Sequence, residues 1–203
     1  MTYLVARVLY ADGMAALITL GATYAALLLD WNFLEMIVFA LVSTACSTLG
    51  GYLAAAFDMR LGPKRALIIE ITAIVFLHSL AITITPDALF LGLIENESVW
   101  SGPVFQSLSD VSYLSLTVLT GMFVLASLSS SRTLMVAMAP PNMRGEFFGL
   151  FAVAGTITVW IGPLMVEAFT RAFNSQRIGM ASLSILFLAG LIILLRVKHD
   201  GRA

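Results

Sequence analysis

The chain has 203 residues, of which 60% are hydrophobic and 11% are charged, and its mean hydropathy is +0.96. Soluble domains are usually about half apolar and about one quarter charged, so this composition excludes an ordinary soluble domain. A net charge of −1 offers no basic surface to nucleic acid, and one cysteine, Cys46, excludes a disulfide scaffold. No cluster of His, Cys and carboxylate residues has metal-site spacing, so we expect neither a metal nor a cofactor.

Six apolar stretches are long enough to cross the hydrocarbon core of a bilayer, which takes about 20 helical residues. They cover residues 4–29, 34–57, 66–85, 111–139, 146–170 and 178–197. The first is too long for a signal-peptide core and has no basic segment before it, which indicates a retained span. The sequence therefore predicts an all-α polytopic membrane protein, with six transmembrane helices forming one domain over residues 1–203 and surrounded by lipid.

The loops between the spans differ in their content of Lys and Arg, which favour the cytoplasmic side. One side of the membrane receives Arg60, Lys64, Arg65, Arg144, Arg196, Lys198 and Arg202. The other side receives Arg171, Arg177 and the acidic residues of the longest loop, 86–110. Both termini are thus predicted to be cytoplasmic.

Local patterns give three further expectations. Residues 89–94 of the outer loop are expected to form a short interfacial helix. Glu167 and Arg171 are spaced i,i+4 and are expected to neutralise each other at a helix end. Gly162-Pro163, inside the fifth span, predicts a bend because proline removes a backbone donor.

Ionisable residues inside the spans are functional candidates, because they cost a few kcal/mol or more in hydrocarbon unless paired or hydrated. Asp12 lies roughly 12 Å from the cytoplasmic start of the first span, and Arg132 roughly 10 Å from the cytoplasmic end of the fourth. Opposite charges at nearly one depth predict an ion pair or a shared polar cavity. The alternative is a fixed pair that only specifies helix packing.

Residues around this pair extend the candidate site. Ser131 and the neighbouring hydroxyls offer hydration or ligand contacts, while Arg7 is placed to snorkel toward the interface or to guard the cavity mouth. Glu70 lies near the start of the third span, where the basic loop and the positive helix end are expected to stabilise it. His78 is expected to be a hydrogen-bonded packing residue.

The loop Asp58-Met59-Arg60-Leu61-Gly62-Pro63-Lys64-Arg65 resembles the signature loop of the major facilitator superfamily. That loop usually reads Gly, three residues, Asp, Arg, any residue, Gly and two basic residues. Arg60, Gly62 and Lys64 fit this pattern, whereas Ala55, Met59 and Pro63 depart from it and Asp58 stands one position early. The resemblance implies a cytoplasmic gating loop built from Asp58, Arg60, Gly62, Lys64 and Arg65.

Three stretches resemble the second half of the vacuole effluxers, the autophagy-related permease branch of that superfamily, and of their bacterial relatives. They are residues 6–13, residues 60–65, and the motifs spread over residues 131–163. The resemblance implies half of a facilitator, with a three-plus-three inverted repeat. It also implies that the first and fourth helices face a solute cavity, and with them Asp12 and Arg132, and that the membrane is a bacterial cytoplasmic membrane.

A full facilitator has two six-helix halves, and this sequence supplies one. The first hypothesis is a transporter subunit that moves a small polar solute, such as an amino acid, by alternating access after forming a parallel homodimer or joining a second half-transporter. Arg132 would suit a carboxylate unless Asp12 occupies it, and proton coupling through Asp12 would make solute flux depend on pH between about 5 and 8. The alternatives are a non-transporting assembly subunit of a larger complex and a fragment of a full-length transporter. An enzyme is not expected, because no nucleophile and base pair or phosphate-binding loop can be assembled.

Overall fold

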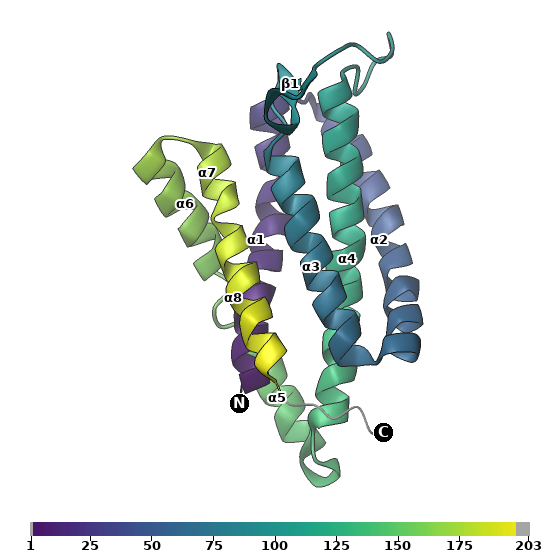
Figure 1. Cartoon of the computed structure of the whole chain (residues 1–203), viewed down its shortest axis with the longest axis vertical. Coiled ribbons are helices and arrows are strands. Elements are labelled where there is room, and N and C mark those ends of the chain that lie inside the picture. Colours follow the sequence, from purple (N-terminus) through teal and green to yellow (C-terminus); the bar gives the residue numbers. More distant parts are fainter. Residues whose placement is uncertain (1, 198–203) are drawn as a thin grey trace.

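The computed structural model describes residues 2–197, and almost all of them are helical (Figure 1). In chain order, the elements are α1 (Thr2–Leu29), α2 (Phe33–Leu61), α3 (Pro63–Ile82), β1 (Ala88–Leu89), η1 (Phe90–Gly92), β2 (Ile94–Glu95), α4 (Leu108–Met138), η2 (Pro141–Met143), α5 (Arg144–Ala154), α6 (Ile161–Phe173), α7 (Gln176–Ala181) and α8 (Leu183–Arg196).

Five segments of the described chain are long and apolar enough to cross a membrane. They are α1, α2, α3, α4 and the combined α7–α8 segment, Gln176–Arg196. Each begins and ends within about one turn of the predicted span. The predicted fifth span is different, because the turn formed by residues 155–160 divides it into α5 and α6.

The bend predicted at Gly162-Pro163 therefore lies in the wrong place. Pro163 falls in the first turn of α6, where backbone N–H groups have no partner inside the helix and a proline is tolerated. Gly162 has a different role: a Cβ built on it would lie 2.7 Å from the carbonyl oxygen of Asp12. The absence of a side chain there lets α6 approach the backbone of α1.

Two capping boxes fix where α2 and α4 begin. The side chain of Asn32 accepts hydrogen bonds from the backbone N–H groups of Leu34 and Glu35, and the carboxylate of Glu35 accepts from the backbone N–H of Asn32. Ser107 and Asp110 form the same reciprocal pair at the start of α4. These polar groups satisfy donors that the first turn of a helix leaves free, so they set the ends of two predicted spans.

The spans form two groups that lie side by side (Figure 1). One group contains α2, α3 and α4, and the other contains α1, α8, α6 and α7. Glycines allow the closest crossings: a Cβ on Gly50 of α2 would lie 2.2 Å from the carbonyl oxygen of Met122 in α4, and one on Gly190 of α8 would lie 3.0 Å from the backbone nitrogen of Tyr10 in α1. Small residues at such crossings are how membrane helices gain packing without a hydrophobic driving force.

A small hairpin replaces the expected interfacial helix in the loop between α3 and α4. Strands β1 and β2 pair antiparallel, with Ala88 opposite Glu95 and Leu89 opposite Ile94. Leu91 and Gly92 at the tip have φ angles of 64° and 91°, so the chain turns back on itself instead of continuing as a helix. The expectation of a helix over residues 89–94 is wrong.

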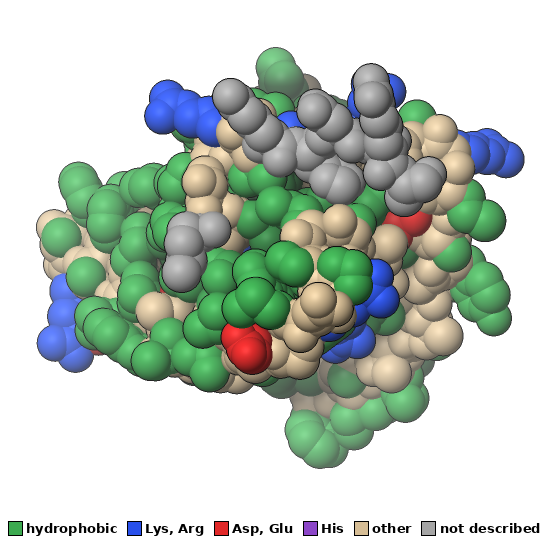
Figure 2. Space-filling model, turned by 90° about the horizontal axis from the view of Figure 1, so that it is seen from below, with side chains coloured by type: hydrophobic (Ala, Val, Ile, Leu, Met, Phe, Trp, Pro, Cys, Tyr) green, Lys and Arg blue, Asp and Glu red, His purple; other side chains and the backbone are tan. Residues whose placement is uncertain are grey.

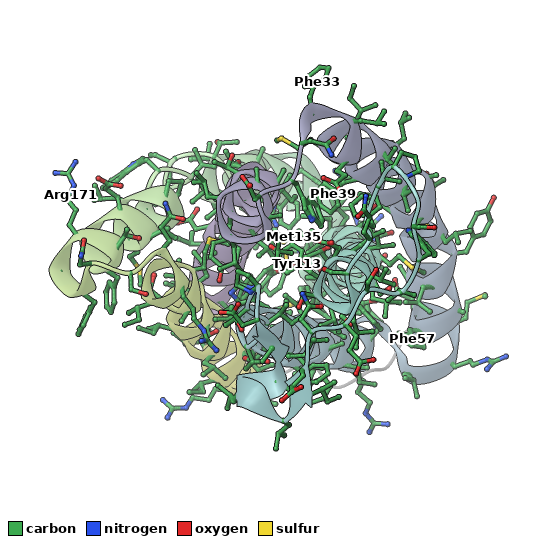
Figure 3. All side chains as sticks on the ribbon, turned by 90° about the horizontal axis from the view of Figure 1, so that it is seen from above. Phe33, Phe39, Phe57, Tyr113, Met135 and Arg171 are labelled. Carbon is green, nitrogen blue, oxygen red and sulfur yellow. The ribbon has the colours of Figure 1, made fainter. Side chains whose placement is uncertain are left out.

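The two ends of the bundle carry different groups. α1 begins and α8 ends at one end, here called the inner end, and the hairpin lies at the opposite, outer end (Figure 1). Seen from the inner end, basic side chains lie at the edges and also near the middle of a face on which hydrophobic side chains are abundant (Figure 2). Viewed from the outer end, Tyr113 and Met135 point into the bundle while Phe33 and Arg171 point away from it (Figure 3). That the inner end is cytoplasmic stays a prediction.

Candidate functional site: two cavities along α4

An inner cavity of about 310 Å³ lies between α1, α4 and α5. Helices α1 and α4 contribute Arg7, Leu128 and Arg132, and α5 with the turn after it contributes Phe148, Phe151, Ala152, Gly155 and Thr156. The predicted site residues Arg7 and Arg132 are thus brought together at one cavity. Among the described residues, its walls contain two positive charges and no acidic side chain.

Arg7 does not snorkel to the interface. Its side chain is only 8% exposed, its guanidinium carbon lies 3.5 Å from the centre of the Phe151 ring, and Nε donates to the carbonyl oxygen of Phe151 at 3.3 Å. The attraction of a cation to an aromatic face holds the group in this position. Nη1 is buried and has no hydrogen-bond partner among the described residues.

Arg132 is exposed on the open side of the cavity and is not paired with Asp12, so the predicted ion pair is wrong. Within residues 2–197, the single ion pair joins Arg171 and Glu167 on the outer surface of α6, which confirms the expected i,i+4 contact. Arg132 continues a stripe on α4 that includes Leu125 and Leu128, since residues spaced three or four apart share one helix face.

Asp12 faces a different neighbour from the predicted one. It is 1% exposed, its Oδ1 accepts a hydrogen bond from Thr158 Oγ1 at 3.0 Å, and its Oδ2 has no partner among the described residues. Five residues of helix turn the side chain about 140° from the direction of Arg7. Asp12 therefore contacts the turn between α5 and α6 and does not line the inner cavity.

The serines next to Arg132 join helices. Ser131 Oγ is hydrogen-bonded to Tyr10 Oη at 2.8 Å, and the carbonyl oxygen of Ser131 accepts from Tyr3 Oη at 2.6 Å. Both contacts are buried, so they tie α4 to α1 near the inner end. Ser131, predicted for the solute pathway, is thus fully buried and does not line either cavity.

Glu70 and His78 point from α3 into the bundle. Glu70 is fully buried two turns from the start of α3, where Oε1 accepts from Ser130 Oγ at 3.0 Å and Oε2 has no partner among the described residues. It faces α4 and not the basic loop, contrary to expectation. His78 donates from Nε2 to the carbonyl oxygen of Met180 at 3.0 Å, which confirms its predicted packing role.

The predicted gating loop is a tight connection between α2 and α3. Gly62 has a φ of 79°, which favours glycine, and its N–H donates to the carbonyl oxygen of Asp58 at 3.0 Å. Lys64 Nζ donates to the carbonyl oxygen of Leu195 at 3.5 Å, which links the loop to α8. Neither Asp58 nor Arg60 forms an ion pair within the described residues, and Arg65 is exposed.

An outer cavity of about 440 Å³ lies toward the hairpin end, and the sequence analysis did not predict it. It is bounded mainly by α1, α2 and α4, and its polar wall consists of hydroxyls together with His78. The hydroxyl residues are Tyr24, Ser43, Thr44, Ser47, Thr48, Tyr113, Thr117 and Thr120. Four of them, Ser43, Thr44, Ser47 and Thr48, are spaced i, i+1, i+4, i+5 on α2. This helical spacing indicates a polar helix face and could have been recognised in the sequence.

Leu128 connects the two cavities, because it lines both of them. The outer cavity occupies the hairpin half of α4 and the inner cavity occupies the half that contains Arg132. The two cavities therefore adjoin along α4, with the apolar side chain of Leu128 between them.

This arrangement is that of half a transporter bundle. The fold matches the structure of the xylose transporter XylE from E. coli in a partially occluded inward-open conformation, with a TM-score of 0.74 at 15% sequence identity. The match covers 98% of this chain and 49% of XylE, so the chain spans about half the length of that transporter and has the fold of half a major facilitator.

The sequence identifies the family. A model of the vacuole effluxer Atg22-like family matches residues 1–202, and the chain belongs to that family. This confirms the resemblance inferred from residues 6–13, 60–65 and 131–163. A comparison with curated proteins gives no significant match. Family and fold are those of secondary transporters in a membrane.

Proposed function

We propose that this chain is a half-size subunit of a secondary transporter, and that it moves a small polar solute such as an amino acid by alternating access after two halves have assembled. The observation that carries the proposal is the pair of adjoining cavities along α4, which together span most of the bundle. A solute path needs such cavities, whereas a subunit that only packs against other proteins does not require them.

The proposed partner is a second copy of the chain in the same orientation, or a separate half of the same fold. Two of the spans leave large apolar faces uncovered: the buried residues of α2 are Glu35, Gly50 and Ala54, and α5 and α6 bury one residue each, Phe151 and Gly162. Facilitators place the second and fifth helices of each half beside the other half. Lipid alone would also cover these faces. The oligomeric state in gentle detergent therefore decides whether a second half or lipid covers them.

Arg132 and Asp12 have separate roles in this proposal. Arg132 lines the solute path, while Asp12 is the proton-carrying group, because it holds the turn between α5 and α6 through Thr158 and has no cation within 4 Å among residues 2–197. A change in the protonation of Asp12 would alter that contact and thereby the position of α5.

The test is uptake of radiolabelled amino acids by liposomes that contain the purified protein. We expect Arg132→Gln to abolish flux and Asp12→Asn to abolish its dependence on pH between about 5 and 8. Arg171→Gln is the matched control, because Arg171 lies on the outer surface and pairs with Glu167. Wild-type flux equal to that of empty liposomes, or flux unchanged by Arg132→Gln, would refute the proposal. Stable co-purification with a larger complex, without flux, would support the assembly-subunit alternative.

A further inference from the structure

We infer that the inner cavity binds an anionic oxygen group, a carboxylate or a phosphate, between the guanidinium groups of Arg7 and Arg132. The inference rests on the proposed transport function and extends it by giving the charge class of the solute. Within the described part of the chain, the charged groups on the cavity wall are two arginines, with no Asp or Glu.

Arg7 has donors to spare. A guanidinium carries five N–H donors, and Nε uses one of them on the carbonyl oxygen of Phe151. Nη1 is buried and unpartnered within the described residues, on a side chain that is more than nine-tenths buried. A buried donor without a partner costs roughly 1–3 kcal/mol, and more when it is charged, so Arg7 gains stability from any acceptor that reaches it.

The cavity holds this guanidinium in place. The ring of Phe151 lies against one face of it, and Gly155 leaves room at its edge, since a Cβ on Gly155 would lie 2.7 Å from Nη2. Any larger residue at position 155 would move the group. Arg7 is thus positioned before a ligand arrives, which lowers the entropy lost on binding.

No acidic residue within 2–197 lines the inner cavity. Asp12 bonds to Thr158, Glu70 bonds to Ser130 in the α3–α4 contact, and neither lines the cavity. Planar guanidinium groups bind carboxylates and phosphates through paired, charge-assisted hydrogen bonds. Two such groups beside a cavity of about 310 Å³ fit a small anion or the carboxylate end of a larger solute.

The site is tested by protection of arginine side chains from phenylglyoxal, followed by mass spectrometry of peptides. The protein is held in nanodiscs of phosphatidylcholine, and acetate or inorganic phosphate is added at constant ionic strength, with chloride as the reference. We expect acetate or phosphate to protect Arg132 and to leave Arg171 reactive, because the Arg171 side chain is 80% exposed outside the cavity. Equal protection of both arginines, or protection of neither, would overturn the inference.

Two variants separate binding from folding. Arg7→Gln is expected to raise the half-protecting anion concentration at Arg132 by about tenfold or more, the effect of one lost charge-assisted hydrogen bond. Arg7→Lys keeps the positive charge but lacks the planar guanidinium. Its half-protecting anion concentration is expected to lie between those of the wild type and Arg7→Gln. Unchanged protection in Arg7→Gln would contradict anion binding between Arg7 and Arg132. Partial recovery of protection in Arg7→Lys would show that the lost charge, and not misfolding, causes the effect.

A third arm distinguishes a solute from a lipid headgroup. Nanodiscs containing phosphatidylglycerol present an anionic headgroup to the same arginines. Protection by phosphatidylglycerol but not by acetate or phosphate would overturn the solute assignment. Because protection is measured without flux, anion binding by a protein that does not transport would refute the proposed function and leave this site intact.

Discussion

The two cavities along α4 differ in the chemistry of their walls. The outer cavity has hydroxyls and His78 but no Lys, Arg, Asp or Glu, while the inner cavity has two arginines and few hydroxyls. Hydroxyls donate and accept, so they suit many solutes, whereas a guanidinium only donates and carries a fixed charge. In the proposed transporter, the inner cavity therefore selects the solute by its charge and the outer cavity conducts it.

Closing the junction of the cavities should have the largest effect. Leu128→Trp adds bulk to the residue that lines both cavities, and we expect flux to fall by more than about tenfold. Leu119→Trp is the control, since Leu119 is an exposed α4 residue that lines neither cavity. Normal flux in Leu128→Trp would mean that solute does not pass from one cavity to the other.

Displacing Arg7 should have a smaller effect, confined to the inner cavity. Gly155→Ala places a methyl group against Nη2, so the guanidinium must shift by tenths of an ångström. We expect anion protection of Arg132 to weaken by about threefold to tenfold, consistent with the loss of part of a hydrogen bond. Gly149→Ala on α5 is the matched control, because nothing lies within 4 Å of a Cβ there. Equal results from the two variants would show that Arg7 does not bind the anion.

The smallest effect should come from the hydroxyls of the outer cavity. Tyr113 Oη donates to the carbonyl oxygen of Gly21 at 3.3 Å, whereas Tyr24 Oη is buried without a partner among the described residues. Tyr113→Phe should lower the free energy of unfolding by about 1 kcal/mol, and Tyr24→Phe should leave it unchanged or raise it slightly. Both are measured by denaturant titration in detergent. A larger loss from Tyr24→Phe would reveal water or solute bound to its hydroxyl.

Sequence reasoning located the spans because length and apolar content alone decide what crosses a bilayer. It also placed Asp12 and Arg132 at similar depths, but depth carries no information on rotation about the helix axis. Arg7 and Ile18 are eleven residues apart, about three turns, so they lie on one face of α1, and both line cavities. Asp12 lies on another face and contacts Thr158.

The broken span was the least predictable element. Residues 155–160 contain no charged residue and lie within an apolar stretch, so hydropathy does not reveal a break, although glycine and β-branched residues within them have low helix propensity. The bend was predicted at Pro163 instead, because a proline inside a helix breaks it. A proline in the first turn does not, and the sequence alone does not show that a helix begins at Ile161. The break could therefore not be predicted without knowledge of the tertiary contacts with α1.

Those contacts tie the broken span to α1 at two points. Arg7 donates to the carbonyl oxygen of Phe151 in α5, and Asp12 accepts from the hydroxyl of Thr158 in the turn itself. An anion bound by Arg7 would place its charge beside Phe151, and a change of charge on Asp12 would alter the contact with Thr158. In the proposed transporter, solute and proton would then both act on the connection between α5 and α6.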